Sequence, residues 1–281
     1  MRKFSLSLSI AILSLLFVFY TKNLFAQNPT RDEFNRALET YSIKYEEYNK
    51  AHDEYVLAKA QYIKFKTLAS KTNAQAATVD MLQKRDEVVI YYLYAIRARL
   101  NDSSITIDDA KKNDLFGKLD SEVSWFNTHK QNISTNDSLE NLIIKSDEAK
   151  AEFKKFNFPV YDSLFSISRG RMVKYRSRFD TSFTGLTDLV AKIRTEKRAE
   201  YSLSEDKLNT IDRWVTEIRD RLIKSDSEMS KADEAAHKMT GEIDNRGTYN
   251  GALVSLGKAN DYLKQSISYT KEIIREIKIA E

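Results

Sequence analysis

Two pairs of polar residues in this sequence have spacings that could support chemistry, and the first resembles a pair of metal ligands. Glu234 and His237 are three residues apart, so on a helix both side chains lie on one face, as ligands do in carboxylate-bridged di-iron bundles. Such a centre needs a second Glu-x-x-His, but the residues three places before His52 and His129 are not acidic. We therefore interpret Glu234 and His237 as part of a solvated helix face and predict no bound metal.

The second pair, Ser255 and Lys258, has the spacing of a serine nucleophile and its lysine base. The Lys-Thr-Gly motif that accompanies this pair in serine enzymes is absent, and both residues fall in a predicted bundle helix. The sequence also lacks H-E-x-x-H, G-x-S-x-G, P-loop and G-x-G-x-x-G motifs, and its seven glycines offer few phosphate-binding loops. We therefore predict that the chain has no catalytic residues, no cofactor and no enzymatic activity.

A third candidate is a run of five cations within ten residues, with no acidic residue among them. Its members are Arg169, Arg171, Lys174, Arg176 and Arg178. On a helix these side chains flank the apolar Met172, Tyr175 and Phe179, so the face could bind anionic lipid or a wall polymer. The alternative, which we favour, is a solvated face whose cations pair with neighbouring acids.

Aromatic residues recur every seven positions near the start of the chain. Phe34 is followed by Tyr41, Tyr48, Tyr55 and Tyr62 at this interval. Exposed tyrosines could stack on sugars, but heptad-spaced tyrosines more often form a packed seam with their hydroxyls at its edge. The heptad predicts a helix of about 40 residues that crosses a partner helix with a left-handed twist.

The elements that must position these residues are helices throughout. The chain contains two prolines, seven glycines and no cysteine, too little punctuation for a turn-rich β fold. Apolar periodicity and capping residues predict about seven long amphipathic helices: 30–70, 75–101, 106–132, 139–156, 159–199, 204–243 and 249–277. We predict an elongated all-α bundle with coiled-coil-like antiparallel hairpins.

Several local signals set the expected boundaries of these helices. Thr30 with Glu33, and Ser202 with Glu205, form the Thr/Ser-x-x-Glu pattern of a capping box. Gly247 is expected to end the helix before it, because glycine adopts the left-handed conformation at low steric cost. Pro159 disfavours helical geometry at the residue before it and suits the first turn of a new helix. We therefore place the main division there, between an N-terminal half at 27–158 and a C-terminal half at 159–281.

Residues 1–26 have the composition of a secretory signal peptide. Arg2 and Lys3 precede an uncharged apolar run at 4–20, and Ala26 offers a small residue at a plausible cleavage point. The run is also close to the minimum length for spanning a bilayer, so an uncleaved anchor is the alternative. In both cases we expect the remaining chain to be exported and extracytoplasmic: periplasmic, on the cell surface or secreted.

The charge of the chain argues against a nucleic-acid partner. Residues 1–26 hold three of the 45 basic residues and none of the 41 acidic ones, which leaves 42 against 41, a net charge of about +1. A chain with so little net charge has no global attraction to a polyanion.

Two short segments resemble parts of uncharacterised exported helical proteins of uncultured bacteria. They are Leu119–Lys130, with the sequence LDSEVSWFNTHK, and Gly247–Ala252, with the sequence GTYNGA. The resemblance covers about a third of the chain. It implies an exported all-helical protein of bacterial origin and carries no activity with it.

These observations together favour an extracytoplasmic helical interaction or scaffold protein without catalytic activity. We expect its partner to be a protein or a cell-envelope component, and we expect membrane contact only through residues 1–26 if they remain attached. The oligomeric state is left open. The alternative function is a binding module for an anionic envelope surface or polymer, which would use the five cations at 169–178.

Overall fold

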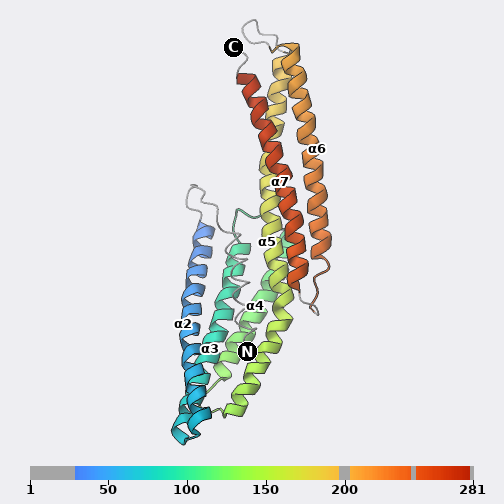
Figure 1. Ribbon diagram of the computed structural model, residues 1–281. Coiled ribbons are helices and arrows are strands. Elements are labelled where there is room, and N and C mark those ends of the chain that lie inside the picture. Colours follow the sequence, from blue (N-terminus) through green and yellow to red (C-terminus); the bar gives the residue numbers. More distant parts are fainter. Residues whose placement is uncertain (1–28, 196–202, 242–244, 279–281) are drawn as a thin grey trace.

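The computed structural model describes residues 29–195, 203–241 and 245–278, and their regular secondary structure is entirely helical (Figure 1). Its helices are α2 (Pro29–Phe65), α3 (Leu68–Leu100), α4 (Asp109–Asn132), α5 (Leu139–Thr195), α6 (Glu205–Ala236) and α7 (Asn245–Lys278). The predicted all-α fold is confirmed for this part of the chain. The described helices number six where seven were predicted.

The six helices form an elongated molecule of two lobes (Figure 1). The lower lobe contains α2, α3, α4 and the first half of α5, whereas the upper lobe contains the second half of α5 with α6 and α7. Helix α5 has 57 residues, which corresponds to a length of about 86 Å. It therefore runs through both lobes and is the only described helix that does so.

The helix boundary predicted at Pro159 is wrong, because Pro159 lies inside α5. A proline in a helix interior removes one hydrogen bond and costs about 3 kcal/mol. The packing of the neighbouring residues opposes this cost, since Phe156 and Val160 are only 2% and 7% exposed. The predicted fourth and fifth helices are thus a single helix, which also runs through the predicted division between residues 27–158 and 159–281.

Two of the predicted turns lie elsewhere. The turn between the first two helices is at Lys66 and Thr67, inside the predicted helix 30–70, and the Thr67 hydroxyl accepts a hydrogen bond from the backbone N–H of Ser70 (3.2 Å). Gly247, expected in a helix-ending turn, lies inside α7. The side chains of the two predicted capping residues Thr30 and Ser202 lie outside the described residues.

The core follows the apolar stripes of the sequence. In the upper lobe α6 and α7 run antiparallel, and their stripes of mostly aliphatic and small residues are buried (Figure 1). Ala232, Ala252 and Ala259 are completely inaccessible, and the Ser225 hydroxyl donates to the Ala259 carbonyl oxygen (2.9 Å). Small residues at the α6–α7 contact let the two backbones approach closely.

In the lower lobe Tyr41 is 4% exposed and its ring lies 5.6 Å from that of Tyr92 in α3. Its hydroxyl is buried and has no hydrogen-bond partner in the described part of the chain, so it does not reach the edge of the contact, and Tyr48 and Tyr55 are only partly buried.

Candidate functional site

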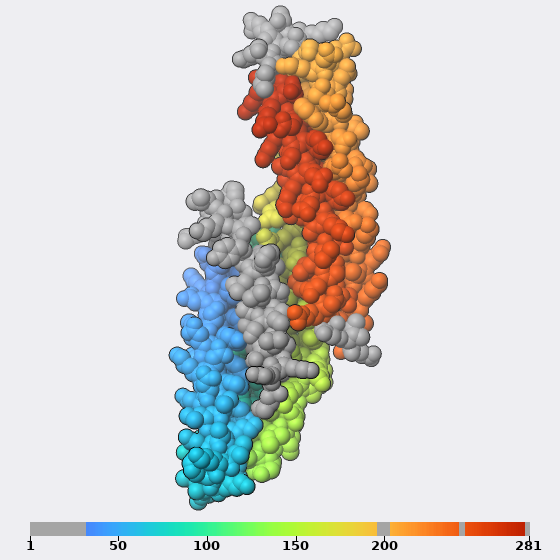
Figure 2. All heavy atoms as spheres, viewed as in Figure 1, coloured from blue at the N-terminus to red at the C-terminus, as the bar shows by residue number. Residues whose placement is uncertain are grey.

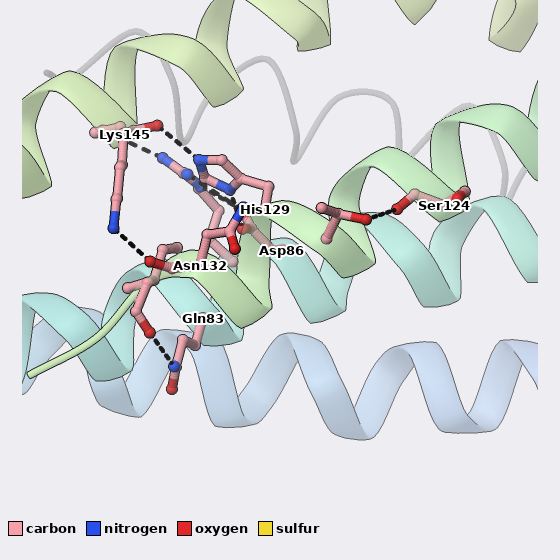
Figure 3. Close-up of polar contacts among 10 residues, drawn as sticks. Gln83, Asp86, Ser124, His129, Asn132 and Lys145 are labelled. Atoms are coloured by element: carbon pink, nitrogen blue, oxygen red, sulfur yellow. Dashed lines mark hydrogen bonds and ion pairs between the residues drawn. The ribbon is translucent and has the colours of Figure 1, made fainter.

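A cluster of charged side chains is buried where α3, α4 and α5 meet (Figure 3). Asp86 of α3 is fully buried, and His129 of α4 is 6% exposed. The Nδ1 atom of His129 lies 2.5 Å from Asp86 Oδ2, while its Nε2 atom lies 3.0 Å from the Lys145 carbonyl oxygen. Arg85 donates from Nε and Nη2 to Asp86 Oδ1 (3.3 and 3.2 Å) and from Nη1 to Ser146 Oγ (3.2 Å).

Both ring nitrogens of His129 face oxygen atoms. A backbone carbonyl oxygen can only accept a hydrogen bond, so the Nε2 atom that faces it is the donor. Trp125 stacks on the ring at a centroid distance of 4.9 Å and an interplanar angle of 10°. In this arrangement the buried Asp86 carboxyl group lies between the Arg85 guanidinium and the His129 ring, so each of its oxygen atoms has a hydrogen-bond partner.

The Asp86–His129 pair superficially resembles the pair that activates a nucleophile in hydrolases. In those enzymes the second ring nitrogen is available to take a proton from serine or cysteine. In this protein that nitrogen is bonded to the Lys145 carbonyl oxygen, and the chain has no cysteine. The cluster therefore holds three helices together and is not arranged as a catalytic site.

The same cluster fixes the loop that connects α4 to α5. The Lys145 ammonium donates to Asp137 Oδ2 (2.6 Å) and to the Asn132 carbonyl oxygen (Figure 3). Gln83 of α3 donates to the Ile133 carbonyl oxygen (2.9 Å). Beside the cluster, Arg85 lines a small cavity of about 20 Å³, which is room for about one water molecule and not for a substrate.

Sequence reasoning missed this cluster, because it interpreted His129 only as a possible metal ligand. Arg85 and Asp86 lie within the polar run Gln83–Glu87, whose sequence is QKRDE. Both residues are buried in the structure, whereas Gln83, Lys84 and Glu87 are only partly buried. The residue types in this run do not distinguish the buried pair from its neighbours, so the sequence carries no local signal for the cluster.

The five cations predicted as an anion-binding face are divided between two environments. Arg169 makes a bidentate ion pair with Asp233 of α6, with Nε–Oδ1 and Nη2–Oδ2 distances of 3.1 and 3.0 Å. Arg176 pairs with Asp180 (2.9 Å) and with Asp226 of α6. These two cations therefore pair with neighbouring acids, as the favoured interpretation expects.

The other three cations lie along a different line of α5. Arg171, Lys174 and Arg178 are spaced i, i+3 and i+7, which places them on one helix face. Tyr175 joins this face with 39% exposure, and the Arg171 Nη2 atom donates to its hydroxyl (3.4 Å). The structure thus brings together three of the five predicted residues as a surface patch, flanked by an exposed aromatic ring.

A shallow hollow of about 620 Å³ lies on the upper lobe beside Arg176. Its lining is Val173, Arg176, Ser177, Asp180, Thr181, Thr184 and Met229. The Arg176 charge is offset there by Asp180, and the remaining polar groups are hydroxyls. The hollow therefore contains no unbalanced charge that would select an ionic ligand.

The two pairs with chemistry-like spacing lie on the surface of the upper lobe. Glu234 and His237 are both exposed at the end of α6, and Ser255 and Lys258 lie on α7, half-buried and exposed respectively. Among the residues that the structure describes, no group of three or more His, Cys, Asp or Glu side chains is arranged to bind a metal.

Glu122 of α4, outside these groups, has a raised pKa. Burial and the nearby Glu152 raise the pKa of Glu122 to about 7, against the opposing effect of Lys155. The Oε2 atom of Glu122 is buried and has no hydrogen-bond partner in the described part of the chain. This group makes the stability of the lower lobe depend on pH.

Comparison with protein-family models, with curated proteins and with solved structures finds no significant match to this chain. In the described ranges, no helix combines the length and the apolar character needed to cross a bilayer.

Proposed function

We propose that this chain is an extracytoplasmic helical interaction or scaffold protein without catalytic activity, which holds partners at its two ends at a fixed separation. The observation that carries this proposal is the continuity of α5 through both lobes. A single helix of about 86 Å connects the two lobes, and its hydrogen-bond ladder continues on both sides of Pro159, where the proline removes one bond.

Contacts at the middle of α5 support the same function. The Lys111 ammonium of α4 pairs with Asp162 (2.6 Å), and Arg169 pairs with Asp233 of α6. Tyr161 packs against Tyr249 of α7 at a centroid distance of 5.2 Å. Within a few turns, α5 therefore binds elements of both lobes, which opposes bending between them.

The finer features of the proposal concern the hairpins and the compartment. The helix pairs α2–α3 and α6–α7 have the long antiparallel contact expected of coiled-coil-like hairpins (Figure 1). We propose that residues 1–26 direct export, either as a cleaved signal peptide or as an anchor, and that the chain is a bacterial exported helical protein. The composition of residues 1–26 and the two resembling segments support this.

The alternative function, binding of an anionic envelope surface through the cations at 169–178, has a narrower basis. Arg169 and Arg176 already pair with acidic residues. The alternative therefore depends on Arg171, Lys174 and Arg178, and it would use Tyr175 as an aromatic contact.

Site-specific photocrosslinking in cells tests the proposed function. A photoreactive residue is placed at the exposed Leu68 in the lower lobe or at the exposed Leu189 in the upper lobe. The proposal expects crosslinked products of different mass from the two positions, in an extracytoplasmic fraction. Crosslinks from neither position, or products that remain in the cytoplasm, would contradict it. Ser177, beside the hollow on α5, is the control position.

A further inference from the structure

The turn between α2 and α3 forms the far end of the lower lobe (Figures 1 and 2). Several apolar side chains near this turn are exposed. We call residues 56–71 the hairpin tip. Its exposed apolar members, with their exposed fractions, are Val56 (50%), Leu57 (62%), Ile63 (61%), Phe65 (57%) and Leu68 (82%). Single exposed apolar residues are normal, but a cluster at one end of a molecule marks an interaction surface.

The hairpin tip is also strongly basic. It contains Lys59, Lys64, Lys66 and Lys71, and no acidic residue occurs between Glu54 and Asp80. Glu140 of α5 is an acid that faces the hairpin tip: hydrogen bonds from its own backbone N–H and from Ser138 lower its pKa, and the charge of Lys71 lowers it further. The Lys64 ammonium lies 5.1 Å from the centre of the Phe65 ring, so charge and apolar surface adjoin each other.

The combination of exposed apolar side chains and lysines favours one binding partner over another. A second copy of the same hairpin tip would place four lysines against four lysines, and like charges repel. An anionic bilayer surface accepts both features, because apolar side chains enter the acyl boundary and lysines contact headgroups. Lysine stems also extend their charge toward the headgroups while their methylenes stay in apolar surroundings.

We propose that the hairpin tip is a peripheral membrane-binding element that inserts Phe65 and Leu68 into the interface of an anionic bilayer, with Lys64 and Lys66 against the lipid headgroups. From the sequence we expected membrane contact only through residues 1–26. The hairpin tip is a second proposed site of membrane contact. This proposal names a partner for one end of the scaffold, but it does not depend on the rigidity of α5.

Vesicle co-sedimentation tests the proposal with a chain that begins at Gln27. This chain retains all the described helices and lacks the apolar run at 4–20. Vesicles of phosphatidylcholine are compared with vesicles that contain about one-third phosphatidylglycerol. We expect binding to the anionic vesicles only, weakened by added salt because the lysine contacts are screened.

Matched variants locate the binding surface. K64Q/K66Q is expected to lower the partition coefficient of the protein onto anionic vesicles about 25-fold, because each lysine contributes a factor of about five. F65S/L68S is expected to lower it at least about ten-fold. The apolar control is I223S/V254S, which changes two exposed upper-lobe residues, and the charge control is K192Q/K271Q, which changes two exposed upper-lobe lysines outside the basic face of α5. Both controls are expected to bind like the parent chain.

A labelling experiment separates insertion from adsorption. Because the chain has no cysteine, Leu68→Cys and Ile223→Cys each take one environment-sensitive fluorophore. We expect a blue shift with anionic vesicles at position 68 and no shift at position 223. Equal binding to neutral vesicles, no binding at all, or loss of binding in K174Q/R178Q, on the basic face of α5, but not in K64Q/K66Q would overturn the proposal. Self-association that F65S/L68S abolishes, without vesicle binding, would identify a second copy as the occupant instead.

Discussion

The backbone N–H of Thr106 donates a hydrogen bond to the carbonyl oxygen of Gly170, at 3.1 Å. This bond fastens the loop between α3 and α4, part of the lower lobe, to the middle of α5. Arg169, the preceding residue in α5, pairs with Asp233 of the upper lobe. Consecutive residues of one helix thus bind opposite lobes, so close packing at Gly170 should matter for the whole molecule.

Gly170→Ala should destabilise the protein. A Cβ at this position would lie 2.5 Å from Ile105 Cγ2 and 2.7 Å from the Thr106 carbonyl oxygen, which requires the backbone to shift. Overpacking of this kind costs about 1–3 kcal/mol. Gly185→Ala is the control, since its Cβ would meet nothing within 4 Å and alanine favours a helix interior by up to about 1 kcal/mol. Urea unfolding of both variants checks this, and equal shifts would show that Gly170 is not tightly packed.

Leu222→Ala in α6 should lower the free energy of unfolding by about 2–5 kcal/mol, because a buried leucine loses its packing. Leu222 is 7% exposed, whereas the next residue, Ile223, is 68% exposed. Ile223→Ala removes a similar aliphatic volume from the surface and should change stability by less than about 0.5 kcal/mol. Thermal unfolding followed by circular dichroism measures both. A larger effect at Ile223 would mean that the face of α6 packed on α7 is assigned wrongly.

Asp86→Asn should cost about 3–5 kcal/mol, since it leaves the buried Arg85 guanidinium and the His129 ring without their carboxylate. The same substitution in an exposed pair is the control. Arg97 and Asp120 pair at 2.8 Å with side chains 39% and 49% exposed, and Asp120→Asn should cost less than about 1 kcal/mol. Chemical denaturation at neutral pH compares the two. Similar small losses would show that the buried cluster does not hold the lower lobe together.

Glu122→Gln should change the free energy of unfolding in a pH-dependent way. Relative to the parent protein, the variant should be more stable above pH 7 than it is below pH 4.5. The pKa of Glu122 is raised from 4.5 to about 7, so the folded state binds this proton more tightly than the unfolded chain does. The resulting stability is fully present below pH 4.5 and is lost as pH rises through 7. Because the Glu122 carboxyl group is only half-buried, water screens part of this contribution to stability. We expect the free energy of unfolding to change by about 1 kcal/mol. Unfolding curves of the parent and the variant across this pH range give the difference in their free energies of unfolding. If this difference does not change with pH, Glu122 is not the source of the pH dependence.

Much of the fold is predictable from local pattern. The stripe through Ile211, Ile218 and Leu222 predicts the buried face of α6, because helix periodicity alone determines which residues share a face. The continuity of α5 at Pro159 is not predictable in this way. The local rule disfavours it, and burial of Phe156 and Val160 by other helices overrides that rule.

In the candidate sites, too, some features are predictable from the local sequence and others depend on how the helices pack. The run of basic residues at 169–178 is visible in the sequence, but the acids that pair with Arg169 and Arg176 lie mainly on α6, about 50 or more positions away. The partners of Asp86 lie on α4 as well as on α3. Such pairings depend on which helices pack together, and no spacing within one helix encodes that.

The distance between two spin labels on either side of Pro159 tests the central claim, the rigid continuity of α5, most directly. Labels on cysteines introduced at the exposed Lys150 and Leu189 should be about 58 Å apart in a continuous helix. Pulsed electron paramagnetic resonance on the chain that begins at Gln27 should give one narrow distribution near this value. The control pair, Asn250 and Arg275 on α7, should give about 38 Å with a similar width. A broad distribution, or a mean well below 58 Å, for the α5 pair alone would contradict the scaffold with fixed separation.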